Sequence, residues 1–132
     1  MSSGHRILKD LLDAFNPEGP GYSPLTATAT GTKIADDSLL QIVVPTWGAA
    51  TNILILPAPT PGLVVIIAGA ATGGELRSSA PATVAINGGT GVGAESAVAA
   101  GMMVVAICES ATSWKAFTMA TNGDLTKLEA AA

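Results

Sequence analysis

The stretch that decides how this chain folds is residues 75–98, ELRSSAPATVAINGGTGVGAESAV. Its short apolar pieces are separated by Pro81 and by a glycine cluster at residues 88–93, a pattern typical of short β-strands joined by turns. Longer apolar runs flank the stretch at residues 62–68 and 102–108. We therefore expect the centre of the chain to be β-structure.

The composition agrees with many short strands. The chain has 132 residues, enough for one domain with a core of its own. Fifteen glycines and eight prolines predict many turns, and because only 4% of the residues are aromatic, we expect a core of Val, Ile, Leu and Ala. Strands are expected at residues 39–44, 52–56, 63–68, 75–79, 83–87, 95–98, 102–109, 114–121 and 125–128.

Short turns between these strands predict the fold class, which is mainly β. We expect an antiparallel β-sandwich, with a small β-barrel as the alternative. Pro45 is expected to end the strand before it, and Asn122-Gly123 predicts a hairpin near the C-terminus. Residues 25–32 suit either an edge strand or an extended connector.

Three of the expected strands are apolar at consecutive positions, so both of their faces are apolar. They are residues 52–56, 63–68 and 102–108. A sheet with one face in water would alternate apolar and polar residues. We therefore predict a homo-oligomer, in which another subunit covers the second apolar face.

The N-terminus differs from the rest of the chain, and we divide the sequence into a helical arm at residues 1–16, a linker at 17–32 and a β domain at 33–132. The arm carries apolar residues at helical spacing, and Asn16-Pro17 is expected to end it. The stripe consists of Ile7, Leu8, Leu11, Leu12 and Phe15. A helix this short needs a partner surface, on its own domain, on a neighbouring subunit or on another protein.

Charge and hydropathy exclude several classes of partner. The net charge is −4 and the six Lys and Arg residues do not cluster, which argues against nucleic acid and against an anionic membrane. The longest uncharged apolar runs, residues 62–71 and 97–108, are shorter than the ~18–20 residues of a membrane-spanning helix. The first residues do not resemble a signal peptide, so we expect a soluble protein made in the cytoplasm.

The best match to a catalytic or cofactor motif is Gly89-Thr90-Gly91-Val92-Gly93-Ala94, which fits the G-x-G-x-x-A dinucleotide fingerprint. The segment after it, residues 94–101, is too short for the crossover helix that the fingerprint requires. A glycine-rich loop between strands is the preferred interpretation. We therefore expect no cofactor.

The remaining reactive side chains do not form a catalytic or metal-binding pattern. His5 is the single histidine and lies far in sequence from Cys108, which sits in an apolar run and is expected to be a buried thiol. The carboxylates Asp36, Asp37, Glu75, Glu95 and Glu109 show no ligand spacing. We predict no metal and no enzymatic activity. Trp47, Arg77 and Trp114 are possible interface residues, with core packing as the alternative for the tryptophans.

Residues 52–114 resemble small virion structural proteins of tailed bacteriophages, in particular marine phages and cyanophages. The resemblance rests on Leu56-Pro57-Ala58-Pro59-Thr60-Pro61-Gly62, on residues 75–89 and on Ser113-Trp114. It covers about half of the chain and consists of strand and turn residues rather than catalytic ones. It implies a β domain on the phage particle, with no catalytic residues.

The resemblance implies a capsid decoration, or cement, protein. Such a protein binds the outer head surface as an oligomer, most often a trimer, and stabilises contacts between major capsid subunits. The apolar stripe of the N-terminal arm would then dock on a sister subunit or on the capsid. The alternative is a tail or head-fibre component that binds the host surface.

Overall fold

The computed structural model of the protein describes residues 22–36, 38–91 and 96–128. These residues form eleven strands and no helix. The predicted N-terminal helix lies outside the described residues. The strands are β1 Tyr22–Thr26, β2 Thr32–Lys33, β3 Leu40–Thr46, β4 Ile53–Ile55, β5 Val64–Ile67, β6 Gly74–Arg77, β7 Ala85–Ile86, β8 Ser96–Val98, β9 Met103–Ser110, β10 Ser113–Met119 and β11 Leu125–Lys127.

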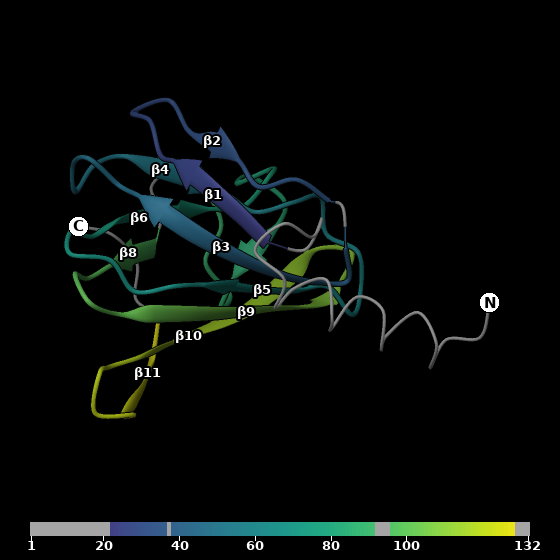
Figure 1. The fold of residues 1–132 in the computed structure, drawn as a ribbon. Helices are drawn as coiled ribbons and strands as arrows, with labels where there is room; N and C mark the ends of the chain where they lie inside the picture. Colours follow the sequence, from purple (N-terminus) through teal and green to yellow (C-terminus); the bar gives the residue numbers. More distant parts are fainter. Residues whose placement is uncertain (1–21, 37, 92–95, 129–132) are drawn as a thin grey trace.

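The strands form two sheets that pack face to face (Figure 1). Sheet A has the order β1-β3-β5-β9-β10-β11, and β7 pairs with the start of β10. Sheet B has the order β2-β4-β6-β8. Both sheets have open ends, so the fold is not a closed barrel.

The first half of the described chain winds around the core, because successive strands alternate between the two sheets. β1, β3 and β5 are parallel neighbours in sheet A, and β2, β4 and β6 are parallel neighbours in sheet B. The register aligns Tyr22 with Ile42 and Ile42 with Ile66, so each winding stacks on the one before. After β6 the chain returns along both sheets, and β8, β9, β10 and β11 add antiparallel pairs.

The prediction of an antiparallel sandwich is therefore right about the two packed sheets, but both sheets are mixed rather than antiparallel. Parallel strands need a crossover connection. Here each crossover contains a strand of the opposite sheet. Short strands with turns between them look the same in sequence whether the next strand returns beside its predecessor or crosses to the other sheet.

Two boundaries also differ from the prediction. β1 begins at Tyr22, so the β body starts earlier than residue 33, and the edge-strand alternative for residues 25–32 is confirmed at its first residues. β3 continues through Pro45 to Thr46. Pro45 is tolerated because the pairing of β3 with β5 ends at Val43, so no neighbour on that side requires a donor from residue 45.

The core lies between the sheets and is built mostly from aliphatic side chains, as expected. Val43, Val65 and Val104 of sheet A face Leu54 and Leu76 of sheet B, and all five are fully buried. The largest buried side chains are the two tryptophans, Trp47 and Trp114.

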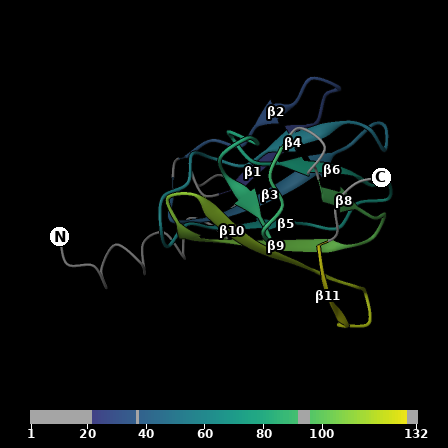
Figure 2. The same cartoon turned by 180° about the vertical axis from the view of Figure 1, so that it is seen from behind.

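Figure 2, which views the molecule from behind, shows the hairpin of β10 and β11 projecting beyond the body, away from β2. The turn of the hairpin is the predicted one. Gly123 adopts a φ of +89° and donates its N–H to Ala120 O at 2.9 Å. The Asn122-Gly123 prediction is confirmed.

Candidate functional site

The most prominent surface feature is the outer face of sheet A, the side turned away from sheet B. Strand alternation and register place three neighbouring rows of side chains on it. The rows are Leu40, Val64, Ile107 and Lys115; then Ile42, Ile66, Val105, Phe117 and Lys127; then Val44, Met103, Met119 and Leu125. Of these thirteen side chains, all except Lys115 and Lys127 are apolar.

Most apolar side chains of the outer face are half-buried, but two are open to water. Ile107 is 41% exposed and Leu125 is 61% exposed. At one end, the face is bordered by the exposed ion pair of Lys115 and Glu109, whose Nζ and Oε1 atoms lie 3.6 Å apart. A contiguous apolar sheet face of this kind is typical of a contact surface.

The expectation of two apolar faces is confirmed for residues 63–68 and 102–108, which supply β5 and β9. At residues 52–56, the second apolar face of the strand is explained differently. There the turn at Gly31 lies directly on Ile55, so close that a Cβ on Gly31 would be 2.5 Å from Ile55 Cδ1. The second face of β4 is therefore covered by the chain itself and needs no other subunit.

The projecting hairpin extends the outer face beyond the body of the protein. Leu125 is paired with Met119, and Met119 with Met103, so the three side chains form one row that continues onto β11. Residues 121–127 are all exposed. The sequence predicted the turn of this hairpin but did not single out Leu125, since a lone leucine in a weak strand carries no pattern.

A groove lies on the inner side of the same hairpin. Its volume is about 200 Å³. The lining residues are Ala97, Ala99, Met102, Thr118, Thr126, Lys127 and Leu128. With Lys127 as its single charged lining residue, the groove has the character of a contact surface for small apolar and hydroxyl groups.

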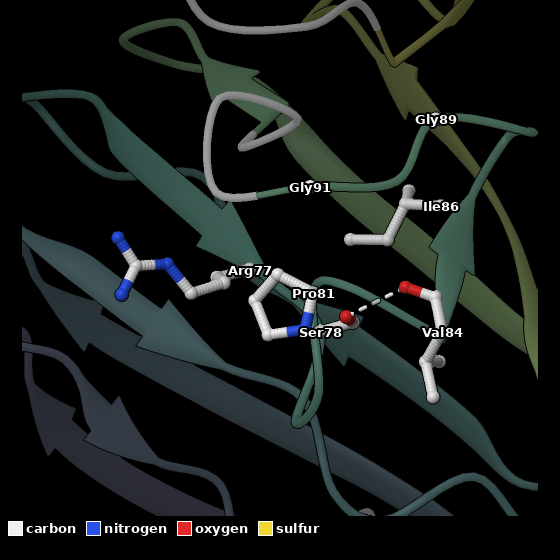
Figure 3. A pocket seen from close by; sticks show the side chains of 7 residues that line it. All are labelled: Arg77, Ser78, Pro81, Val84, Ile86, Gly89 and Gly91. Atoms are coloured by element: carbon white, nitrogen blue, oxygen red, sulfur yellow. Dashed lines mark hydrogen bonds between the residues drawn. The ribbon is translucent and has the colours of Figure 1, made fainter.

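The glycine-rich stretch is described as far as Gly91, and this part forms a tight loop. Ser78 Oγ donates to Val84 O at 2.8 Å, and Gly91 N donates to Pro81 O at 2.6 Å. The hollow that these residues enclose with Arg77 and Ile86 has a volume of about 10 Å³ (Figure 3), room for about one water molecule. A strand, β8, lies where the dinucleotide fingerprint requires a helix, and this agrees with the preferred interpretation of a loop between strands.

The side chains proposed for interfaces fall into three groups. Ile7, Leu8, Leu11, Leu12 and Phe15 lie outside the described residues. Trp47 and Trp114 are 1% and 0% exposed, so the structure places both in the core. Arg77 is half-buried on β6 and borders the small hollow (Figure 3).

The acidic side chains in the described part of the chain are dispersed. Glu109 accepts a hydrogen bond from Ser113 Oγ at 2.7 Å beside its ion pair with Lys115, whereas Glu75 lies on β6 of the other sheet. Among residues 22–36, 38–91 and 96–128, no three His, Cys, Asp or Glu side chains cluster as metal ligands. The same ranges hold no helix of the length and apolarity that crossing a membrane requires.

Cys108 is buried, as predicted. Its burial leads to a testable prediction about the reactivity of the thiol. Its side chain is 1% exposed, and burial, with a smaller contribution from the Glu109 carboxylate, raises the pKa of the thiol above its ordinary value of 9.0. The native protein should therefore resist a thiol reagent such as Ellman's reagent at pH 8, whereas the unfolded protein should react at once.

The sign of the pH dependence follows from the same pKa shift. Above pH 9 the unfolded state loses the thiol proton before the folded state does, so the free energy of unfolding should fall as the pH rises. Cys108→Ala should remove this part of the slope in urea unfolding measured across alkaline pH. Fast labelling of the native protein would contradict the prediction.

No protein-family model, curated protein sequence or solved structure matches the chain.

Proposed function

We propose that this protein is a structural component of a bacteriophage particle: a capsid decoration, or cement, protein. In this role it binds the outer head surface as an oligomer, most simply a trimer, and stabilises contacts between major capsid subunits. It acts through its surfaces rather than through catalysis. The assignment to the structural proteins of phage particles rests on the resemblance of residues 52–114 to small phage virion proteins.

The observation that carries the proposal is the projecting hairpin. The hairpin projects beyond the body and carries a leucine that is 61% exposed. In an isolated monomer it therefore buries little apolar surface and gains little stability from burial. Leu125 extends an apolar row onto this hairpin, so a neighbouring subunit or the capsid can cover Leu125, Met119 and Met103 together. Covering adjacent subunits is what a cement protein does.

The first test is association of the purified protein. Leu125→Asp should weaken the oligomer, because burying a leucine contributes about 2 kcal/mol, equivalent to roughly thirtyfold in the dissociation constant. The melting temperature of the dissociated protein should not change, since Leu125 packs little within its own chain. Sedimentation over a concentration series measures the association.

Thr121→Asp is the matched control, because it adds the same charge to another exposed position of the hairpin. It should associate like the unmodified protein. A monomer at all concentrations, or equal association of the Leu125→Asp variant, would exclude the hairpin as the contact between copies.

The location on the particle requires a second experiment. Immunogold labelling of virions, together with the copy number per particle, should show label over the whole head and copies in the hundreds. Label confined to the tail or to a few spikes would instead support a fibre component that binds the host surface. Particles without label would overturn both assignments.

A further inference from the structure

We propose that the N-terminal segment of the same chain, residues 1–15, covers the outer face of sheet A at the end where β1 enters the sheet. The contact would join the apolar stripe of the segment to the exposed Ile107 and its neighbours. This inference concerns the fold of one chain, so it does not depend on the function proposed above.

The described part of the chain begins beside the outer face of sheet A. Tyr22 is paired with Ile42, and Ile42 with Ile66, so the first described residue already lies in a row of the outer face. β1 is also the edge strand of sheet A. The preceding 21 residues are therefore attached directly beside the apolar face.

Exposed apolar surface lies at the end of the sheet where β1 begins. Ile107 lies beside Val64, which lies beside Leu40, in the row next to that of Tyr22. The 41% exposure of Ile107 thus occurs at the end of the sheet from which the N-terminal segment arrives. The hairpin residue Leu125 lies at the opposite end, so the two exposed sites are separate surfaces.

The N-terminal segment and the outer face are chemically complementary. The sequence predicts a helix whose one side carries five apolar residues, while Arg6, Lys9, Asp10 and Asp13 occupy the other. These four charges cancel, so the segment offers an apolar contact without a net charge. An apolar sheet face is its natural complement, and the ion pair of Lys115 and Glu109 marks the polar border of that face.

The linker is long enough to allow this contact. Residues 16–21 join Phe15 to Tyr22, and in extended form this connection spans at most about 23 Å. β1 and β9 are three strand positions apart, which is about 14 Å. The linker can therefore bring the stripe over β5 and β9 of its own sheet.

The tether also favours the same chain over a second copy. A short linker holds the segment near its own face at an effective concentration on the order of millimolar. A second copy would have to reach that concentration to compete. The sequence left three partners open, namely its own domain, a neighbouring subunit and another protein, and the position of β1 beside the face favours the chain's own sheet.

Cross-linking within the full-length chain tests the proposal. All variants carry Cys108→Ala, so that the introduced cysteines are the reactive ones, and a short bis-maleimide joins them. Leu11→Cys with Ile107→Cys should cross-link within one chain, at a yield independent of protein concentration. Asp13→Cys with Ile107→Cys is the matched control, because residue 13 lies on the opposite side of the predicted helix, and its yield should be several-fold lower.

A second measurement avoids reliance on cross-linking geometry. The single thiol of Ile107→Cys should react with a maleimide about tenfold faster when Leu11→Asp is added, because the charge displaces the cover. Asp13→Asn should leave the rate unchanged, and circular dichroism should show the β body intact in each variant.

Three results would overturn the proposal. Cross-linked dimers whose yield rises with concentration would place the segment on another copy. Equal cross-linking of residues 11 and 13 would remove the apolar stripe from the contact. An unchanged labelling rate in the Leu11→Asp variant would show that the segment does not cover Ile107.

Discussion

Replacing Asn87 with alanine is expected to lower the free energy of unfolding by about 3 kcal/mol. The side chain of Asn87 acts as a piece of β-strand beside β10. Its Nδ2 donates to Ala116 O at 2.8 Å and to Leu128 O at 3.1 Å, and its Oδ1 accepts from Ala116 N at 2.9 Å. Alanine would lose all three hydrogen bonds and leave the N–H of Ala116 without this partner.

The backbone of Asn87 adds to the cost. Its φ of +52° lies in the left-handed region, which asparagine tolerates better than alanine. Asn87→Gly therefore separates the two effects: it should lose the hydrogen bonds but relieve the strain, and be about 1 kcal/mol more stable than the alanine variant.

Asn87→Asp provides a further comparison. It keeps an acceptor for Ala116 N, but it directs a carboxylate at two carbonyl oxygens and should be as destabilised as the alanine variant. Urea unfolding followed by tryptophan fluorescence measures all three variants. An alanine variant within 0.5 kcal/mol of the unmodified protein would mean that this amide does not hold β7 and the residues after β11 to β10.

The second large effect is expected at Gly74, where an added methyl group would collide with Trp47. A Cβ on Gly74 would lie 2.0 Å from Trp47 Cε3 and 2.5 Å from Cδ2. The indole cannot easily move away, because it is 1% exposed in the core, and the carbonyl of Trp47 is held by Asn52 Nδ2 at 2.7 Å. Gly74→Ala should therefore cost about 3 kcal/mol through overpacking.

A double-mutant cycle identifies the cause of this effect. Gly74 has no positive φ, so alanine suits its backbone and the penalty is steric alone. In a Trp47→Leu background, where the side chain is smaller and can rotate, Gly74→Ala should cost less than about 1 kcal/mol. The same penalty in both backgrounds would show that Trp47 is not what excludes a side chain at residue 74.

Asn87 and Gly74 show which features a sequence pattern can predict and which it cannot. Asn87-Gly88 reads as a turn signal, and the chain does turn there. The sequence does not reveal that the amide of Asn87 bonds to Ala116 and Leu128, which follow it by 29 and 41 residues. Likewise, Gly74 reads as part of a loop, and only the packed structure shows an indole lying against it.

The candidate surfaces were predictable to different degrees. The second apolar face of residues 63–68 and 102–108 was visible in the sequence, because consecutive apolar positions leave no side of a strand for water. The row that runs onto Leu125 was not visible, since it depends on the register of β9, β10 and β11. The close contact of Gly31 with Ile55 was hidden for the same reason.

The sequence by itself determined that this protein is made of short β-strands with an aliphatic core, a hairpin at Asn122-Gly123 and a surplus of apolar surface. These properties are local: apolar runs form strands, and glycine, proline and asparagine end them. The tertiary structure alone decided that β1 to β6 wind between two sheets as parallel neighbours, and which apolar side chains remain uncovered. Those outcomes depend on contacts between residues far apart in the chain, which local spacing does not specify.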